Sequence, residues 1–145
     1  MNQVLSPIPA PPQERQWAAA AHLAALVLAL FTSWFAGVAG MLGAGVVYLA
    51  KRDDAPFAAR HAREALNFNL SMFIYAAVAI GLGIVLLGAT VLTLGFGAIL
   101  TLPAGLVLLL VWAAIAVAWL VCSIVATVKA WNGEEYRYPL TLRLI

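Results

Sequence analysis

The chain has 145 residues, of which 65% are hydrophobic and only 10% are charged. An ordinary water-soluble domain carries about 25% charged residues, so this composition excludes that class and indicates a protein that is solvated by lipid. The net charge of +2 forms no basic patch that would indicate nucleic-acid binding, and the single Cys122 excludes an intrachain disulfide and a cysteine metal site.

The N-terminal segment, residues 1–16, holds four prolines and lacks the basic start of a cleavable signal peptide. We expect it to be a disordered, Pro-rich lead-in, because closely spaced prolines favour extended chain. The membrane domain is then expected over residues 17–131.

The charged residues lie in three windows, at residues 14–15, 51–64 and 129–143. Residues 16–50 and 65–128 between these windows carry no charge. A hydrocarbon core about 30 Å thick needs roughly 20 helical residues, so the longer stretch is sufficient for two spans. We predict helices at about residues 64–87 and 105–130, with a Gly- and Pro-containing break between them.

The first charge-free stretch, residues 16–50, is too long for one membrane span and too short for two full spans. A turn at Thr32–Ser33–Trp34–Phe35 divides it into helices at about residues 17–31 and 38–50. These helices are either thin spans or a re-entrant pair buried against the rest of the protein. In both cases the chain returns to the side from which it entered.

Two hairpins place all three charged windows on one face, and an excess of Lys and Arg makes that face cytoplasmic. The expected fold is therefore an all-α, polytopic four-helix bundle of two hairpins in the inner membrane, with both termini in the cytoplasm. Residues 132–145 form its cytoplasmic tail, which begins with Gly133 as a left-handed helix cap. A three-span alternative would split the charged windows across the membrane.

The connection between the hairpins reads Asp53–Asp54–Ala55–Pro56–Phe57. Asp is a favourable helix cap and Pro is tolerated in a first helical turn, so we expect a short interfacial helix over about residues 55–63.

A polar stripe is predicted just beyond this connection. At 100° per residue, five polar side chains fall on one helix face, and His22 lies at a similar depth on the first helix. The candidate groove residues are His22, Arg60, Glu64, Asn67, Ser71 and Tyr75. Polar groups in lipid must be paired, so the stripe forms either hydrogen bonds that hold the helices together or a hydrophilic groove open to the cytoplasm.

Catalytic chemistry finds little support in the sequence. His61 and Glu64 have metal-ligand spacing, but a single such pair is a weak signal, so no metal and no cofactor are expected. No hydrolase, metalloprotease or phosphate-loop motif is present in the sequence.

Four segments together resemble a known family: Trp17 with His22–Leu23, and the motifs K-R-D-D-A-P-F (51–57), H-A-R-E-A-L-N-F-N (61–69) and N-G-E-E-Y-R-Y-P (132–139). They resemble the bacterial membrane proteins grouped as domain of unknown function 4870, which are Tic20-like. The resemblance covers about residues 14–145 and implies a four-helix membrane domain. It also suggests, by analogy of fold alone, a connection with protein import.

Two functions remain open from the sequence. The first is a non-catalytic protein that assists translocation or assembles with other membrane proteins, or with itself, through the polar groove. The alternative is a small oligomeric channel or transporter. The lipid bilayer is the expected partner in both, and nucleic acid in neither.

Overall fold

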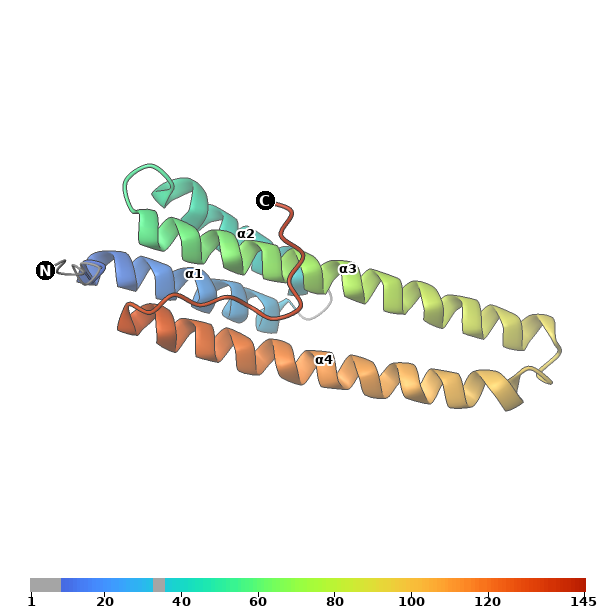
Figure 1. Cartoon of the computed structure of the whole chain (residues 1–145). Coiled ribbons are helices and arrows are strands. Elements are labelled where there is room, and N and C mark those ends of the chain that lie inside the picture. Colours follow the sequence, from blue (N-terminus) through green and yellow to red (C-terminus); the bar gives the residue numbers. More distant parts are fainter. Residues whose placement is uncertain (1–8, 33–35) are drawn as a thin grey trace, which may run out of the picture.

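The structure is a computed structural model that describes residues 9–32 and 36–145. The described residues form four helices and no strand, which confirms the expected all-α class (Figure 1). The helices are α1 (Pro12–Phe31), α2 (Ala36–Lys51), α3 (Pro56–Leu92) and α4 (Ala98–Asn132).

The long helices α3 and α4 form a hairpin, and the shorter α1 and α2 lie beside only one end of it (Figure 1). Small side chains allow these helices to approach closely. Successive layers of the core contain Ala21, Val47 and Ala62, and then Ala25, Ala44 and Ala65. From one layer to the next the residue number rises in α1 and α3 and falls in α2. Helix α1 therefore runs parallel to α3, and α2 runs antiparallel to both.

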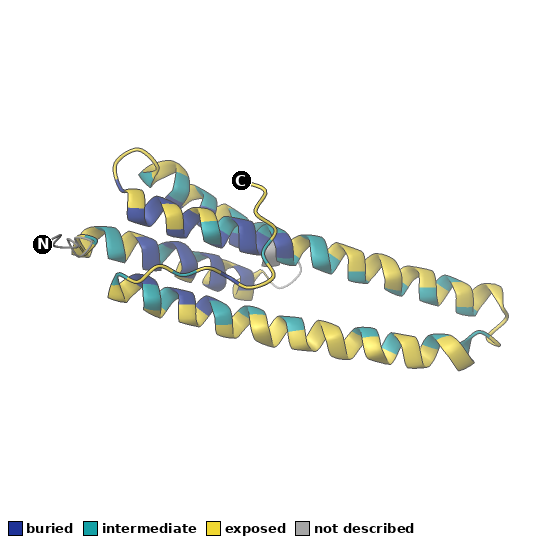
Figure 2. Cartoon of the chain, in the orientation of Figure 1, coloured by how far each residue is buried: buried dark blue, intermediate teal, exposed yellow. Residues whose placement is uncertain are grey.

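Buried residues gather at the end where the four helices meet, which we call the four-helix end (Figure 2). Toward the opposite end, the most apolar 18-residue windows of α3 and α4 are each only 6% buried. Large apolar side chains are mostly exposed there, with Leu92 85% and Phe96 81% exposed. Such a surface is stable in lipid rather than in water, so the chain is a membrane protein.

Two helices of the described chain, α3 and α4, are long and apolar enough to cross a membrane. The apolar part of α2, Val38–Lys51, is shorter than a full span, and α1 does not reach the length and hydropathy of α3 and α4. The structure therefore supports transmembrane helices, but it does not confirm the expected four crossings.

Helix α1 begins earlier than expected, because residues 12–16 are helical rather than disordered. Pro12 occupies the first helical turn, where its missing N–H and fixed φ are compatible with a helix. The side chain of Arg15 donates from Nε to the carbonyl oxygen of Ala10 at 2.7 Å and holds the start of the helix. The remaining expected turn residues Ser33, Trp34 and Phe35 lie outside the described part of the chain, as do residues 1–8.

Helix α3 is one continuous helix, whereas the sequence suggested an interfacial helix over 55–63 followed by a separate helix over 64–87. The expected capping by Asp53 and Asp54 is also wrong. The N-cap residue Ala55 makes no side-chain cap hydrogen bond, and the Oε2 atom of Glu14 accepts the N–H of Phe57 at 2.9 Å. A carboxylate from α1 thus binds the positive end of the α3 dipole.

The break between α3 and α4 covers residues 93–97 and is shorter than the break expected between residues 87 and 105. Pro103 lies within α4, close enough to its start that few backbone hydrogen bonds are disturbed. Near the turn, the hydroxyl groups of Thr90 and Thr101 lie 2.6 Å apart and join the two helices. At the other end of α4, Gly133 has φ 81°, which confirms the left-handed cap.

Candidate functional site

The polar stripe of α3 lies against the last residues of the chain. Residues 134–145, which we call the tail, leave the end of α4 and run back along α3 (Figure 1). All five stripe residues make hydrogen bonds to the tail: Arg60, Glu64, Asn67, Ser71 and Tyr75. The structure therefore brings the predicted stripe together around a segment of its own chain.

The outer part of the stripe binds the tail through charges. The guanidinium of Arg60 donates from Nε and Nη2 to the Oε1 atom of Glu135, at 2.9 and 2.7 Å. Glu64 Oε1 accepts the N–H of Tyr138 at 3.0 Å and also faces Arg143 Nη2 at 3.3 Å. Arg60 and Glu64, which are four residues apart on one helix, thus each pair with the tail.

The inner part of the stripe binds the main chain of the tail. Asn67 Oδ1 accepts the N–H groups of Leu144 and Ile145, both at 3.0 Å, and Asn67 Nδ2 donates to the Ile145 carbonyl oxygen at 3.0 Å. Most main-chain N–H and C=O groups in folded proteins are hydrogen-bonded. The Asn67 side chain alone supplies partners for three such groups of the tail.

Ser71 and Tyr75 complete this recognition of main chain. Ser71 Oγ accepts the N–H of Leu142 at 2.8 Å, and the Tyr75 hydroxyl donates to the Leu140 carbonyl oxygen at 2.7 Å. Leu140 itself has φ 56°, a left-handed conformation that turns the chain. The tail therefore runs along the stripe to Tyr75, reverses at Leu140, and returns toward Asn67.

The remaining predicted site residue, His22, lies away from the stripe and pairs with His61. Its Nε2 atom is 2.9 Å from His61 Nδ1, and its Nδ1 atom is 3.0 Å from the hydroxyl of Tyr138. His22 and His61 are each 1% exposed, and Tyr138 is 3% exposed. The tail thus closes a buried cluster formed by α1 and α3.

One arrangement of protons satisfies both hydrogen bonds of His22. If Tyr138 donates to His22 Nδ1, then His22 Nε2 donates to His61 Nδ1, and the proton of His61 lies on Nε2. That Nε2 atom has no hydrogen-bond partner within the described chain, and Glu135 Oε2 lies 3.9 Å away. Burial raises the pKa of the Tyr138 phenol above its ordinary value of 10.0, which keeps the phenol neutral and able to donate.

Sequence reasoning missed the partners of His22. The spacing of His61 and Glu64 suggested only a weak metal pair, and Tyr138 was noted only as part of the motif over residues 132–139. Their meeting depends on the register of α1 against α3 and on the tail's return, neither of which follows from the spacing of residues. The one available signal was that both histidines lie among alanines, which is typical of close helix packing.

A second buried amide, Asn69, was also missed. Its Nδ2 atom donates to the Ala65 carbonyl oxygen at 2.9 Å, and its Oδ1 atom faces Trp119 Nε1 at 3.4 Å. Asn69 follows Asn67 by two residues and therefore lies on another face of α3, toward α4.

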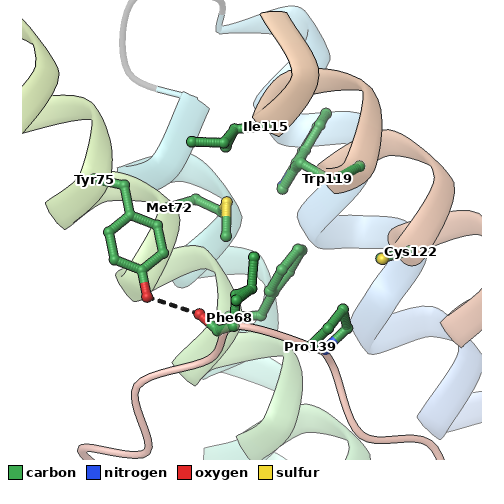
Figure 3. A pocket seen from close by; sticks show the side chains of 9 residues that line it. Phe68, Met72, Tyr75, Ile115, Trp119, Cys122 and Pro139 are labelled. Carbon is green, nitrogen blue, oxygen red and sulfur yellow. Dashed lines mark hydrogen bonds between the residues drawn. The ribbon is translucent and has the colours of Figure 1, made fainter. Parts of the chain in front are cut away.

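An apolar hollow of about 260 Å³ opens between α3 and α4 beside the turn of the tail (Figure 3). Phe68, Met72, Ile115, Trp119 and Pro139 are among the side chains that line it. Its lining offers almost no polar group, so the hollow suits hydrocarbon rather than a polar ligand.

The described residues contain no group of three or more His, Cys, Asp or Glu that could hold a metal ion. The nearest approach to one is the pair of histidines, and their facing nitrogens share a proton at hydrogen-bond distance instead of opening toward a cation. The site is therefore best described as a structural polar core that is sealed by the tail.

Comparison with known proteins identifies the family. The model of the magnetosome magnetite crystal formation protein family matches residues 13–145, which include nearly all of α1, the other three helices and the tail. The chain belongs to this family. The resemblance to the Tic20-like family of domain of unknown function 4870 was wrong, because the motifs that suggested it all lie within the segment matched by the magnetosome family. No curated protein and no solved structure matches the chain.

Proposed function

We propose that this member of the magnetosome magnetite crystal formation family acts in that process as a non-catalytic membrane protein that assembles with other membrane proteins through its charged end. The observation that carries the proposal is the placement of charge. All Asp, Glu, Lys and Arg residues lie at the four-helix end or in the segments beside it, whereas residues 65–128 carry none.

The charge-free end of the α3–α4 hairpin offers poor chemistry for direct contact with iron. Iron sites in proteins use carboxylate, imidazole or thiolate ligands. The turn over residues 93–97 reads T-L-G-F-G and contains none of these groups. We therefore place the contribution of the chain to crystal formation at its charged end, through partners, rather than at this turn.

The charged end displays groups that a partner could bind. Lys51 pairs with Asp54 at 3.1 Å and Arg60 pairs with Glu135 at 2.7 Å, and the carboxylates of both pairs are more than half exposed. Exposed ion pairs contribute only about 0–1 kcal/mol, so these groups can exchange partners at little cost to the fold. The excess of Lys and Arg supports a cytoplasmic position for this end.

Two earlier possibilities lose support. Assistance in protein translocation rested on the Tic20-like resemblance, which was wrong, and on an open polar groove, whereas the tail lies along the stripe. A channel would need a polar path along α3 and α4, but beyond Tyr75 the polar side chains of α3 are reduced to Thr90. The lipid bilayer and neighbouring membrane proteins remain the partners that the surface suits.

The proposal can be tested in magnetite-forming cells in which this chain replaces the resident family member. Combined Asp53→Asn and Asp54→Asn substitutions at the charged end should change the size of the magnetite crystals seen by electron microscopy. Combined Thr93→Val and Phe96→Leu substitutions at the turn should leave crystal size unchanged, at matched protein levels. Altered crystals with the turn variant alone would contradict the proposal.

A further inference from the structure

The α1–α2 pair ends partway along the α3–α4 hairpin. Ala25 of α1 packs at the level of Ala65 of α3, so Phe31, the last residue of α1, is level with about residue 71. Helix α3 continues from there to Leu92, which is about 30 Å at 1.5 Å per residue. The protein is thus four helices wide at its charged end and two helices wide at the other (Figure 1).

The outer face of the α1–α2 pair belongs in lipid. Leu42, Val46 and Leu49 of α2 are 64%, 66% and 64% exposed, and Leu23 of α1 is 49% exposed. Residues 16–50 carry no charge that would solvate this face in water. An apolar surface of this kind rimmed by charges lies at or within a bilayer.

The protein therefore occupies a larger cross-sectional area in one leaflet than in the other. A helix about 10 Å across occupies about 80 Å², so α1 and α2 add about 160 Å² to the leaflet at the charged end alone. A bilayer accommodates unequal leaflet areas by bending, with the wider leaflet on the convex side. We propose that this chain is a membrane wedge, which favours curved membrane with its four-helix end in the convex leaflet.

A wedge must be stiff in order to bend lipid, and the four-helix end is built to be stiff. The His22–His61–Tyr138 cluster joins α1, α3 and the tail. The backbone of α2 at Gly40 lies directly against Asn69 of α3, so α2 is also held closely. At the charged edge, Lys51 Nζ lies 5.0 Å from the centre of the Trp17 ring, which holds the free ends of the α1–α2 pair together.

The test uses the full chain in phosphatidylethanolamine–phosphatidylglycerol vesicles, without iron or mineral, so it stands apart from the proposed role in crystal formation. A Cys122→Ala, Asp54→Cys variant carries one thiol at the charged end. A membrane-impermeant maleimide then measures the fraction of molecules with that end outside. We expect the ratio of outward-facing to inward-facing molecules to be several-fold higher in small vesicles than in large ones. The reason is that the outer leaflet of a small vesicle is strongly convex.

A matched variant removes the wedge and keeps the four-helix end. Insertion of eleven Leu and Ala residues after Phe31, and of eleven before Ala36, extends α1 and α2 by about 16 Å each and carries the pair into the other leaflet. This variant should lose the dependence on vesicle size while its tail remains as resistant to trypsin as in the parent. Equal fractions in small and large vesicles for the parent chain, or equal size dependence in both proteins, would overturn the proposal. Crosslinking between copies through Leu42→Cys, with no size dependence, would instead assign the α1–α2 face to a second copy.

Discussion

The side chain of Asn67 binds both main-chain groups of Ile145. Its Oδ1 atom accepts the Ile145 N–H at 3.0 Å, and its Nδ2 atom donates to the Ile145 carbonyl oxygen at 3.0 Å. An amide side chain carries both a donor and an acceptor, so it can pair with both main-chain groups of one residue. Asn67 thus binds the end of the tail through the same pair of hydrogen bonds that a neighbouring β-strand would provide.

Replacement of Asn67 by Leu should release this end of the tail. Leu has a similar volume but cannot pair, and each hydrogen bond lost to the main chain of the tail costs about 0.5–1.5 kcal/mol. We expect trypsin to cleave after Arg143 and Arg137 faster than in the parent chain. Asn132→Leu, at an exposed position, is the matched control and should leave the cleavage rate unchanged. Equal rates in all three proteins would show that Asn67 does not hold the tail.

The cluster of His22 and Tyr138 should be energetically coupled. In a double-mutant cycle with His22→Leu and Tyr138→Phe, each single change removes the same hydrogen bond, so the double variant should lose less stability than the sum. We expect an interaction free energy of about 0.5–1.5 kcal/mol, measured by unfolding in denaturing detergent. His22→Leu combined with Thr101→Val at the far turn should be additive within about 0.5 kcal/mol. Additivity in both cycles would contradict the bond.

The four helices and the stripe could be predicted from the sequence because each depends on local spacing. A charge-free stretch has a length in residues, and a helix converts that length into ångströms. Residues separated by three, four or seven positions share a helix face whatever surrounds them. For this reason Asn67, Ser71 and Tyr75 were placed on one face correctly, and all three meet a common partner.

The partner of the stripe could not be predicted, because it depends on contacts between distant segments. The tail alternates apolar and polar residues over Leu140–Ile145, but this segment is too short for the pattern to assign its structure or its partner. Its path follows from hydrogen bonds between main-chain atoms and stripe side chains, and main-chain atoms are the same in every residue. The capping of α3 by Glu14, 43 positions away from Phe57, escaped prediction for the same reason.

A side chain at Gly40 should destabilise the protein. A Cβ atom at this position would lie 2.7 Å from Cγ of Asn69 and 3.3 Å from the carbonyl oxygen of Ala25, so either the Asn69 side chain would have to turn away from its partners or α2 would have to move away from α1 and α3. Crowding of a close-packed core costs about 1–3 kcal/mol, and we expect Gly40→Ala to destabilise the protein by this amount in detergent unfolding. Gly81→Ala is the control, because a Cβ atom there meets nothing within 4 Å. That variant should be neutral or slightly more stable, since Ala favours helix.

Tyr138 should make stability depend on alkaline pH. Burial raises the pKa of its phenol above the ordinary 10.0, so above pH 10 the unfolded chain releases this proton while the folded chain retains it. The free energy of unfolding should therefore be constant with respect to this group below pH 10 and fall as the pH rises further. The limiting slope for one group is about 1.4 kcal/mol per pH unit.

Tyr138→Phe isolates this contribution. Burial and the neighbouring Cys122 raise the pKa of Tyr136 to about 12, so Tyr136 adds its own slope above pH 10 in both proteins. The difference in unfolding free energy between the parent and Tyr138→Phe should thus stay flat up to pH 10 and shrink above it. A difference that remains constant through pH 11 would mean that the phenol of Tyr138 titrates equally in both states, and therefore that the tail does not keep it buried against His22.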